Sequence, residues 1–196
     1  MLVSMGFMSW YRRRISRVQQ HATPANALAE AEAGNAEAQF GLGLKCCTVN
    51  GAAQDLEQAA RWYRKAADQG HASAQFNLAM MLARGQGVTQ DDAAALIWTR
   101  KAAEGGDAGA QFDLGSRYHR KSVDRAGMDC DESRVEAYKW LHLAAAQGYR
   151  GSAAACERLT LGMTLEEVTD GNQRAAAFAI REPAMASTSS ISQKHE

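Results

Sequence analysis

Four carboxylates fall within residues 122–132, SVDRAGMDCDE, and clustered carboxylates are the ligands that calcium prefers. Their spacing does not fit the twelve-residue calcium loop, so no metal site is predicted here. We expect a solvated loop, with a role as a contact loop as the alternative. The four acidic residues are Asp124, Asp129, Asp131 and Glu132.

The histidines and cysteines show no spacing typical of a metal or redox site. No two histidines stand four residues apart, as they do on a zinc-binding helix. Cys46 and Cys47 are adjacent and lack the two-residue spacer of zinc and redox motifs. Together with Cys130 and Cys156, they favour a reducing compartment. The histidines are His21, His71, His119, His142 and His195.

The sequence also has no motif for a nucleophile or a phosphate. No G-x-S-x-G is present, and GQGV at residues 85–88 indicates a turn between helices, without the strand that a dinucleotide site needs. We therefore predict no catalytic residue, no metal and no cofactor, and interpret the chain as a non-enzyme.

Composition and charge narrow the class of protein. Lys+Arg and Asp+Glu are both 22, so the chain carries no net charge and predicts no nucleic-acid partner. Only two prolines occur among 196 residues, and the alanine-rich stretch between them predicts an all-α protein. No apolar run approaches the roughly 18 residues of a membrane span.

A block of nine residues occurs three times in similar form, as WYRKAADQG at 62–70, WTRKAAEGG at 98–106 and WLHLAAAQG at 140–148. Gln39, Gln75 and Gln111 are spaced 36 residues apart within a second repeated block, and the third repeat has gained six residues between its halves. A repeated block predicts a repeated structural unit, because a catalytic site needs its special residues only once.

Each repeat contains two helical stretches. The first stretches are predicted at 36–47, 72–84 and 108–121, and the second at 56–69, 92–104 and 134–147. Gly70, Gly106 and Gly148 stand where a helix C-cap favours a left-handed residue. Asp55, Asp91 and Ser133 are predicted N-caps of the second helices, with Ser133 and Glu136 as a capping box.

The predicted fold is a right-handed α-solenoid of antiparallel helix pairs, in which Trp62, Trp98 and Trp140 fill the space between units. The expected parts are a basic arm or capping helix at 1–23, a half-repeat at 24–35, and repeats at 36–70, 71–106 and 107–148. Capping helices are expected at 149–181 and a disordered tail at 182–196.

The repeated residues resemble the Sel-1-like repeat, a relative of the tetratricopeptide repeat. The resemblance covers about 36–148 and rests on A-x-A-Q-F-x-L-G, G-x-G-V-x-x-D and A-x-x-W-x-x-K-A-A-x-x-G. The first unit departs from the pattern, since CCTVNGAAQD replaces its glycine-rich connector. The resemblance implies a non-catalytic adaptor or scaffold, found in bacterial signalling and secretion assemblies and in eukaryotic protein quality control.

Some equivalent positions in the three repeats hold residues of different chemical type. Packing does not explain this variation, and it suggests a binding surface. On the predicted first helices such residues fall at i, i+4 and i+7, which lie on one helical face. These positions, called the first-helix stripe below, are expected on the concave side and are partly cationic, which favours an acidic protein or peptide partner. The stripe comprises Lys45, Asn77, Met81, Arg84, Asp113, Arg117 and Arg120.

The N-terminal arm is basic, since Arg12, Arg13, Arg14 and Arg17 precede the first acidic residue, Glu30. If residues 7–20 are helical, one face is apolar, so the arm suits a solenoid cap or an anionic membrane surface. We favour the cap. Met5 and Met8 are further candidate start residues. The apolar face of the predicted helix at 7–20 comprises Phe7, Trp10, Tyr11, Ile15 and Val18.

Two other functions stay open beside the adaptor. One is an immunity-type inhibitor of a single cognate secreted toxin. The other is a β-lactam-hydrolysing enzyme, since some cysteine-rich relatives act on β-lactams and carry a disulfide in each unit, a pattern that this chain lacks. The expected location is cytoplasmic or peripheral at a membrane, and the sequence predicts no oligomeric state.

Overall fold

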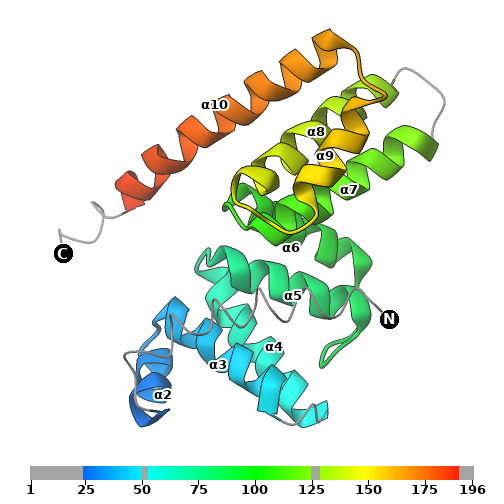
Figure 1. Cartoon of the computed structure of the whole chain (residues 1–196). Helices are drawn as coiled ribbons and strands as arrows, with labels where there is room; N and C mark the ends of the chain where they lie inside the picture. The colour runs from blue at the N-terminus through cyan, green and yellow to red at the C-terminus, as the bar shows by residue number, and fades with distance from the viewer. Residues whose placement is uncertain (1–23, 50–52, 125–128, 190–196) are drawn as a thin grey trace. The chain divides into compact units, whose positions relative to one another are not determined.

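The computed structural model describes residues 24–49, 53–124 and 129–189, and every regular element in these ranges is an α-helix (Figure 1). The predicted N-terminal arm and residues 190–196 lie outside the described residues. The helices are α2 (Pro24–Glu32), α3 (Ala36–Val49), α4 (Ala53–Asp68), α5 (Ala72–Arg84), α6 (Asp92–Glu104), α7 (Ala108–Asp124), α8 (Asp129–Ala146), α9 (Ser152–Thr160) and α10 (Leu165–Ser189).

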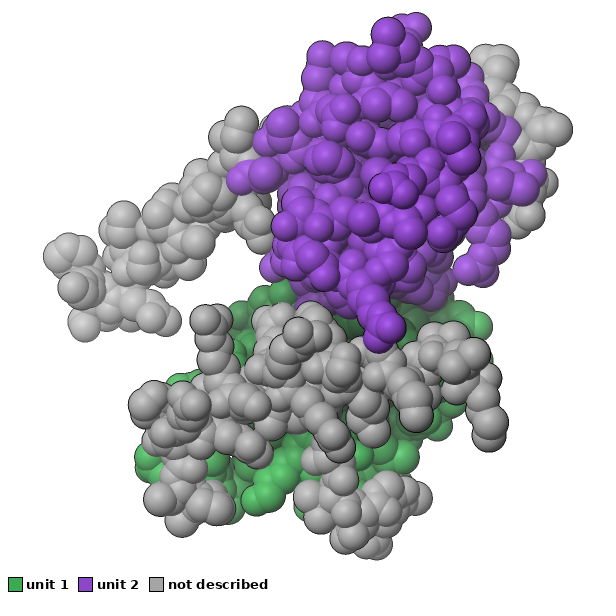
Figure 2. All heavy atoms as spheres, viewed as in Figure 1, with its two compact units in different colours: residues 1–102 green, residues 103–196 purple. Residues whose placement is uncertain are grey.

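The chain forms two compact units, residues 1–102 and 103–196 (Figure 2). Within unit 1, the core joins Phe40 and Leu44 of α3, Tyr63 of α4 and Leu78 of α5. Within unit 2, Tyr138 and Leu141 of α8 pack with Leu159 of α9. The helices thus pack in antiparallel pairs, as predicted for an all-α repeat fold.

The repeated glutamine joins each first helix to the helix before it. The side-chain amides of Gln39, Gln75 and Gln111 donate to the carbonyl oxygens of Ala31, Ala67 and Ala103, at 2.9, 3.1 and 3.2 Å. All three glutamines are buried. Each acceptor lies in the last turn of a helix, where a carbonyl has no partner within the helix. The bond therefore gives the buried side-chain amide a partner and gives the terminal carbonyl a hydrogen bond from the next helix.

The same carbonyl oxygens also receive the backbone N–H of the repeated glycine. Gly70 donates to Ala67 at 3.0 Å and Gly106 to Ala103 at 3.2 Å. Gly70, Gly106 and Gly148 have φ of 87°, 83° and 69°, which is the left-handed region that favours glycine. The repeated glycine and the repeated glutamine therefore donate hydrogen bonds to the same carbonyl oxygen.

A second glutamine extends this network in two of the repeats. The amide of Gln69 donates to the side-chain oxygen of Gln39 at 2.7 Å, and that of Gln147 to Gln111 at 2.9 Å. The buried amide at the start of the first helix is thereby tied to the residue that follows the second helix, which restricts how the two helices rotate.

Small residues allow the helices of a pair to approach closely. A Cβ placed on Gly43 of α3 would lie 2.6 Å from the ring of Tyr63 on α4, and one on Gly115 of α7 would lie 2.9 Å from Leu141 on α8. These contacts are shorter than atoms tolerate, so the packing requires glycine.

The N-caps are partly different from those predicted. Asp91 caps α6, since its carboxylate accepts from the N–H of Ala94 at 2.9 Å. Asp55 and Ser133 are not caps, because α4 begins at Ala53 and α8 at Asp129. The first helices instead share a column of caps just before their first residue: Asn35, His71 and Asp107 accept from the N–H of Ala38, Ala74 and Ala110.

Two segments predicted as irregular contain helix. Residues 129–132 of the expected loop form the first turn of α8, where an acid-rich sequence is favourable because of the helix dipole. Helix α10 continues through Pro183 to Ser189, so the expected tail begins too early. The alanines on both sides of Pro183 are strong helix formers.

Among the described residues, no helix is both long and apolar enough to cross a bilayer.

We predict that Gln111→Leu lowers the free energy of unfolding by about 1–3 kcal/mol, because the side-chain amide of Gln147 and the carbonyl of Ala103 each lose a buried partner. Urea denaturation followed by circular dichroism measures this. The control is Gln173→Leu on an exposed face of α10, which should change stability by less than about 0.5 kcal/mol. Equal effects of the two substitutions would contradict the role of the network.

Candidate functional site

The first-helix stripe is only partly a surface in unit 1. Lys45 of α3 and Arg84 of α5 are exposed, and Asn77 is half-buried. Met81 is 4% exposed and belongs to the hydrophobic core. Its prediction as a contact residue is therefore wrong, because its thioether packs inward with Leu78 and Leu82 and presents no surface to a partner.

In unit 2 the stripe lies on α7 and contains an internal ion pair. The guanidinium of Arg117 donates to the carboxylate of Asp113 at 2.7 Å, one helical turn away. Arg120, one turn further on, is exposed. An exposed i, i+4 pair of this kind contributes only about 0.3–0.5 kcal/mol, so an incoming carboxylate can compete for Arg117.

The stripe thus presents four cations, two in each unit: Lys45 and Arg84 on α3 and α5, and Arg117 and Arg120 on α7. Within the described residues, no ion pair holds Arg84 or Arg120. Guanidinium groups donate in a fixed fork that matches a carboxylate, so this arrangement can bind acidic side chains without first breaking an internal contact at those two positions.

The repeated tryptophans carry lysines on their faces. The ammonium nitrogen lies 4.4 Å from the ring centroid for Lys65 over Trp62 and 4.6 Å for Lys101 over Trp98. Trp140 is buried, whereas Trp62 and Trp98 are only half-buried, so not every tryptophan fills a closed space. The lysine stems cover the ring surface that packing leaves open.

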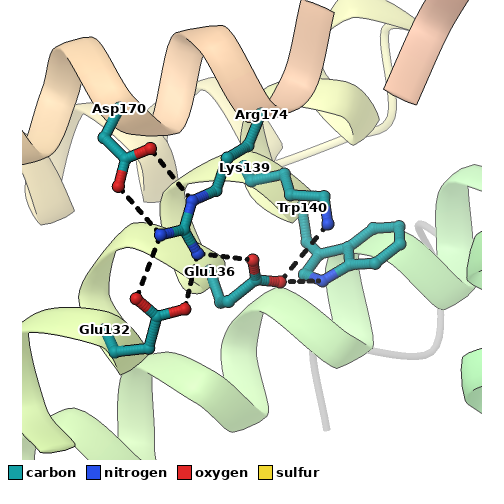
Figure 3. Close-up of polar contacts among 6 residues, drawn as sticks. All are labelled: Glu132, Glu136, Lys139, Trp140, Asp170 and Arg174. Carbon is teal, nitrogen blue, oxygen red and sulfur yellow. Dashed lines mark hydrogen bonds and ion pairs between the residues drawn. The ribbon is translucent and has the colours of Figure 1, made fainter. Parts of the chain in front are cut away.

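An ion-pair cluster between α8 and α10 is the largest group of interacting charges in the described part of the chain (Figure 3). The Arg174 guanidinium of α10 donates to Glu136 at 3.1 Å, to Asp170 at 2.9 Å and to Glu132. Glu136 also accepts from the indole N–H of Trp140 at 3.1 Å. These carboxylates are engaged in holding α10 against α8, which indicates a structural role.

The same helix pair is joined at two more places. Phe178 of α10 meets Trp140 of α8 edge to face at 5.3 Å between ring centroids. Near the start of α10, the Arg134 guanidinium donates to Glu167 at 2.9 Å. Glu167 also completes a capping box with Thr164, accepting from its N–H at 2.7 Å. The cluster, the aromatic pair and this cap together cover one face of α8.

The charges of the cluster shift its acid–base equilibria. A hydrogen bond from Arg174 lowers the pKa of Glu132, against the opposing effect of burial. Burial would raise the pKa of Glu167, but the N–H of Thr164 and the Arg134 guanidinium outweigh it and lower that pKa. Both carboxyls therefore stay ionised to lower pH than usual, and they stabilise the fold in that form.

The metal-ligand side chains remain apart in the described residues, where no group of three could hold an ion. None of the four cysteines, all of which lie in the described residues, forms a disulfide in the structure. His71, noted in the sequence only as an isolated histidine, caps α5 with Nδ1 and bonds Glu37 through Nε2 at 2.9 Å. Its ring also stacks on Phe40, so all of its contacts are structural.

The family model of the Sel1 repeat matches residues 36–71, 72–107 and 108–149, more than half of the chain. The chain belongs to the Sel1 repeat family. Sel1 repeat proteins are generally protein–protein interaction modules built on a helical-repeat solenoid, and the fold is typically a non-catalytic scaffold. A comparison with curated proteins gives no match.

Two solved Sel1-type structures are similar to this Sel1 repeat protein. The protective antigen c5321 of uropathogenic Escherichia coli strains, which displays an SLR fold, is 27% identical with a TM-score of 0.66, covering 88% of this chain and 36% of its own. A Sel1 repeat protein from Oxalobacter formigenes is 33% identical with a TM-score of 0.56, covering 68% of this chain and 96% of its own. The chain therefore spans about a third of the length of the first relative.

Sequence reasoning missed the α8–α10 cluster, whose partners lie about 40 residues apart in the chain. The column of first-helix N-caps could have been found, because Asn35, His71 and Asp107 share the 36-residue spacing. Asparagine and aspartate are usual N-cap residues but histidine is not, so His71 made the three positions harder to recognise as caps.

We predict that Arg174→Met destabilises the Sel1 repeat protein by about 1–2 kcal/mol, since the ion pairs that it removes are partly exposed. The effect should decrease as pH falls below 4.5, the ordinary pKa of Glu132, because a carboxyl whose pKa is lowered by folding loses its stabilising charge on protonation. Urea denaturation at several pH values measures both, with exposed Arg150→Met as the control. A pH-independent difference would contradict the ion-pair explanation.

We also predict four reactive thiols when the protein is unfolded without reductant and counted by mass spectrometry. In the folded protein near neutral pH, alkylation of Cys47 and Cys156 should be slower than in urea, because burial raises the pKa of both thiols and lowers the thiolate fraction. A count of fewer than four would show disulfides and return attention to the cysteine-rich, β-lactam-binding relatives.

Proposed function

We propose that this Sel1 repeat protein is a non-catalytic adaptor that binds an acidic segment of a partner protein on its first-helix stripe. The observation that carries the proposal is the pair of exposed arginines, Arg84 and Arg120, that have no carboxylate partner within the described residues. Each stands on a first helix, and Lys45 and Arg117 add a second cation to each unit.

The contrast with α8 and α10 supports this assignment. There the arginines Arg134 and Arg174 are each surrounded by carboxylates of the same chain and serve the fold. The arginines of the stripe have the same hydrogen-bonding capacity, but among the described residues an acidic side chain pairs only with Arg117. Acidic side chains from a partner would fill the remaining donor positions with charge-assisted hydrogen bonds.

Rigid packing of the helices makes such binding favourable. The stripe residues stand on helices joined to their neighbours by buried glutamines and by glycine contacts too close to admit a Cβ. Because the cations are already held on an ordered backbone, binding orders their side chains but not the chain that carries them. Charge complementarity then sets the rate of encounter and the choice of partner more than the affinity.

The test is affinity capture from a lysate of the source cell, with mass spectrometry to identify bound proteins. The wild type is compared with a quadruple charge reversal, Lys45→Glu, Arg84→Glu, Arg117→Glu and Arg120→Glu. A partner that binds through the stripe should be lost from the variant, and its interaction with the wild type should weaken with rising salt.

A matched control carries the same change of charge elsewhere. Arg61→Glu, Arg64→Glu, Arg150→Glu and Arg158→Glu alter four exposed arginines outside the stripe, two in each unit. Circular dichroism should show that both quadruple variants remain helical. Retention of the same proteins by all three chains would refute the stripe as the binding surface, whereas equal loss from both variants would show a general effect of charge.

A further inference from the structure

Helix α6 carries two large apolar side chains on its outer surface. Leu96 is 39% exposed and Ile97 is 57% exposed. In the neighbouring repeats the residue two positions before the tryptophan is Ala60 or Tyr138, and these are buried at 3% and 6% exposure. The middle repeat thus exposes a leucine at a position that the other two repeats bury.

Charged residues flank Leu96 one helical turn away on each side. Asp92, Leu96 and Arg100 follow one another at i, i+4 and i+8, so they lie on one face of α6, and all three are exposed. We call these three residues the α6 stripe. Ile97 lies beside it, next to Leu96 in the sequence.

The α6 stripe has no role that the repeat fold requires. The corresponding residues are Leu56, Ala60 and Arg64 on α4, and Arg134, Tyr138 and His142 on α8, so its pattern occurs once. Asp92 and Arg100 are about 12 Å apart along the helix, too far to pair with each other. Within the described residues, neither side chain forms an ion pair.

The order of the stripe is self-complementary. Read in one direction it is acidic, apolar, basic, and read in the other it is basic, apolar, acidic. Two copies of α6 packed antiparallel about a two-fold axis would bring Leu96 against Leu96 of the second copy. The same arrangement would bring each Asp92 against Arg100 of the other copy, as a two-fold interface requires.

We infer that the α6 stripe is a homotypic docking surface through which a second copy of this chain binds. An apolar centre bordered by complementary charges is the usual anatomy of a protein interface. One helix face is small compared with the interface of a permanent dimer, so the complex is weak and forms at micromolar or higher concentration. The α6 stripe shares no residue with the first-helix stripe, because α6 is a second helix.

The test is sedimentation equilibrium of the full chain from micromolar to submillimolar concentration, with Asp92→Arg and Arg100→Asp as separate variants. The wild type should dimerise. Each variant alone should associate about tenfold more weakly or worse, because two like-charge contacts replace two ion pairs. A mixture of the two should recover a heterodimer, since the introduced arginine faces the introduced aspartate.

The matched control is Arg64→Asp, which makes the same substitution at the corresponding position of α4 and should leave the dimer unchanged. Circular dichroism establishes that every variant is folded. A wild type that is monomeric throughout the range would overturn the inference. So would a dimer that persists in both single variants, or a mixture that fails to associate.

Discussion

The fold depends on one carbonyl oxygen in the last turn of a helix, which receives two hydrogen bonds. In the middle of unit 1 this atom is the oxygen of Ala67, bonded at 3.0 Å by the backbone of Gly70 and at 3.1 Å by the side chain of Gln75. The first bond turns the chain out of the helix, and the second fixes the next helix against it. Because Gln75 and Ala67 are buried, a change at the glutamine removes a hydrogen bond that water cannot easily replace.

This constraint explains why the repeats agree in some columns and differ in others. A position that supplies the glutamine, the left-handed glycine or a contact without space for a Cβ, such as Gly43 against Tyr63, can hold few residue types. A position on the outer face of a helix has no such limit. Arg84 and Leu96 stand at such exposed positions, and both proposed contact surfaces lie where residue type varies between the repeats.

Charges serve two purposes in this chain, and their surroundings distinguish them. Arg174 is enclosed by carboxylates from α8 and α10, and Phe178 packs on Trp140 beside it, so charge and packing act together to close the end of the repeat array. Arg84 and Arg100 stand on exposed faces, with no ion pair in the part of the chain that the structure describes. A cation that the fold satisfies stabilises the chain, whereas one that the fold leaves open is available to another molecule.

The sequence alone determined the repeat, the all-α fold and the helices of the middle repeat, whose bounds at 72–84 and 92–104 match α5 and α6. These follow from local chemistry: helix propensity, the 36-residue spacing and glycine at each helix end. Only the tertiary structure decided that Met81 is core and Leu96 is exposed, although both are apolar residues on helices. Burial depends on which helix packs over a face, and that neighbour lies far away in the sequence. The same reason hid the partners of Arg174, since no local pattern records which carboxylates a fold brings together.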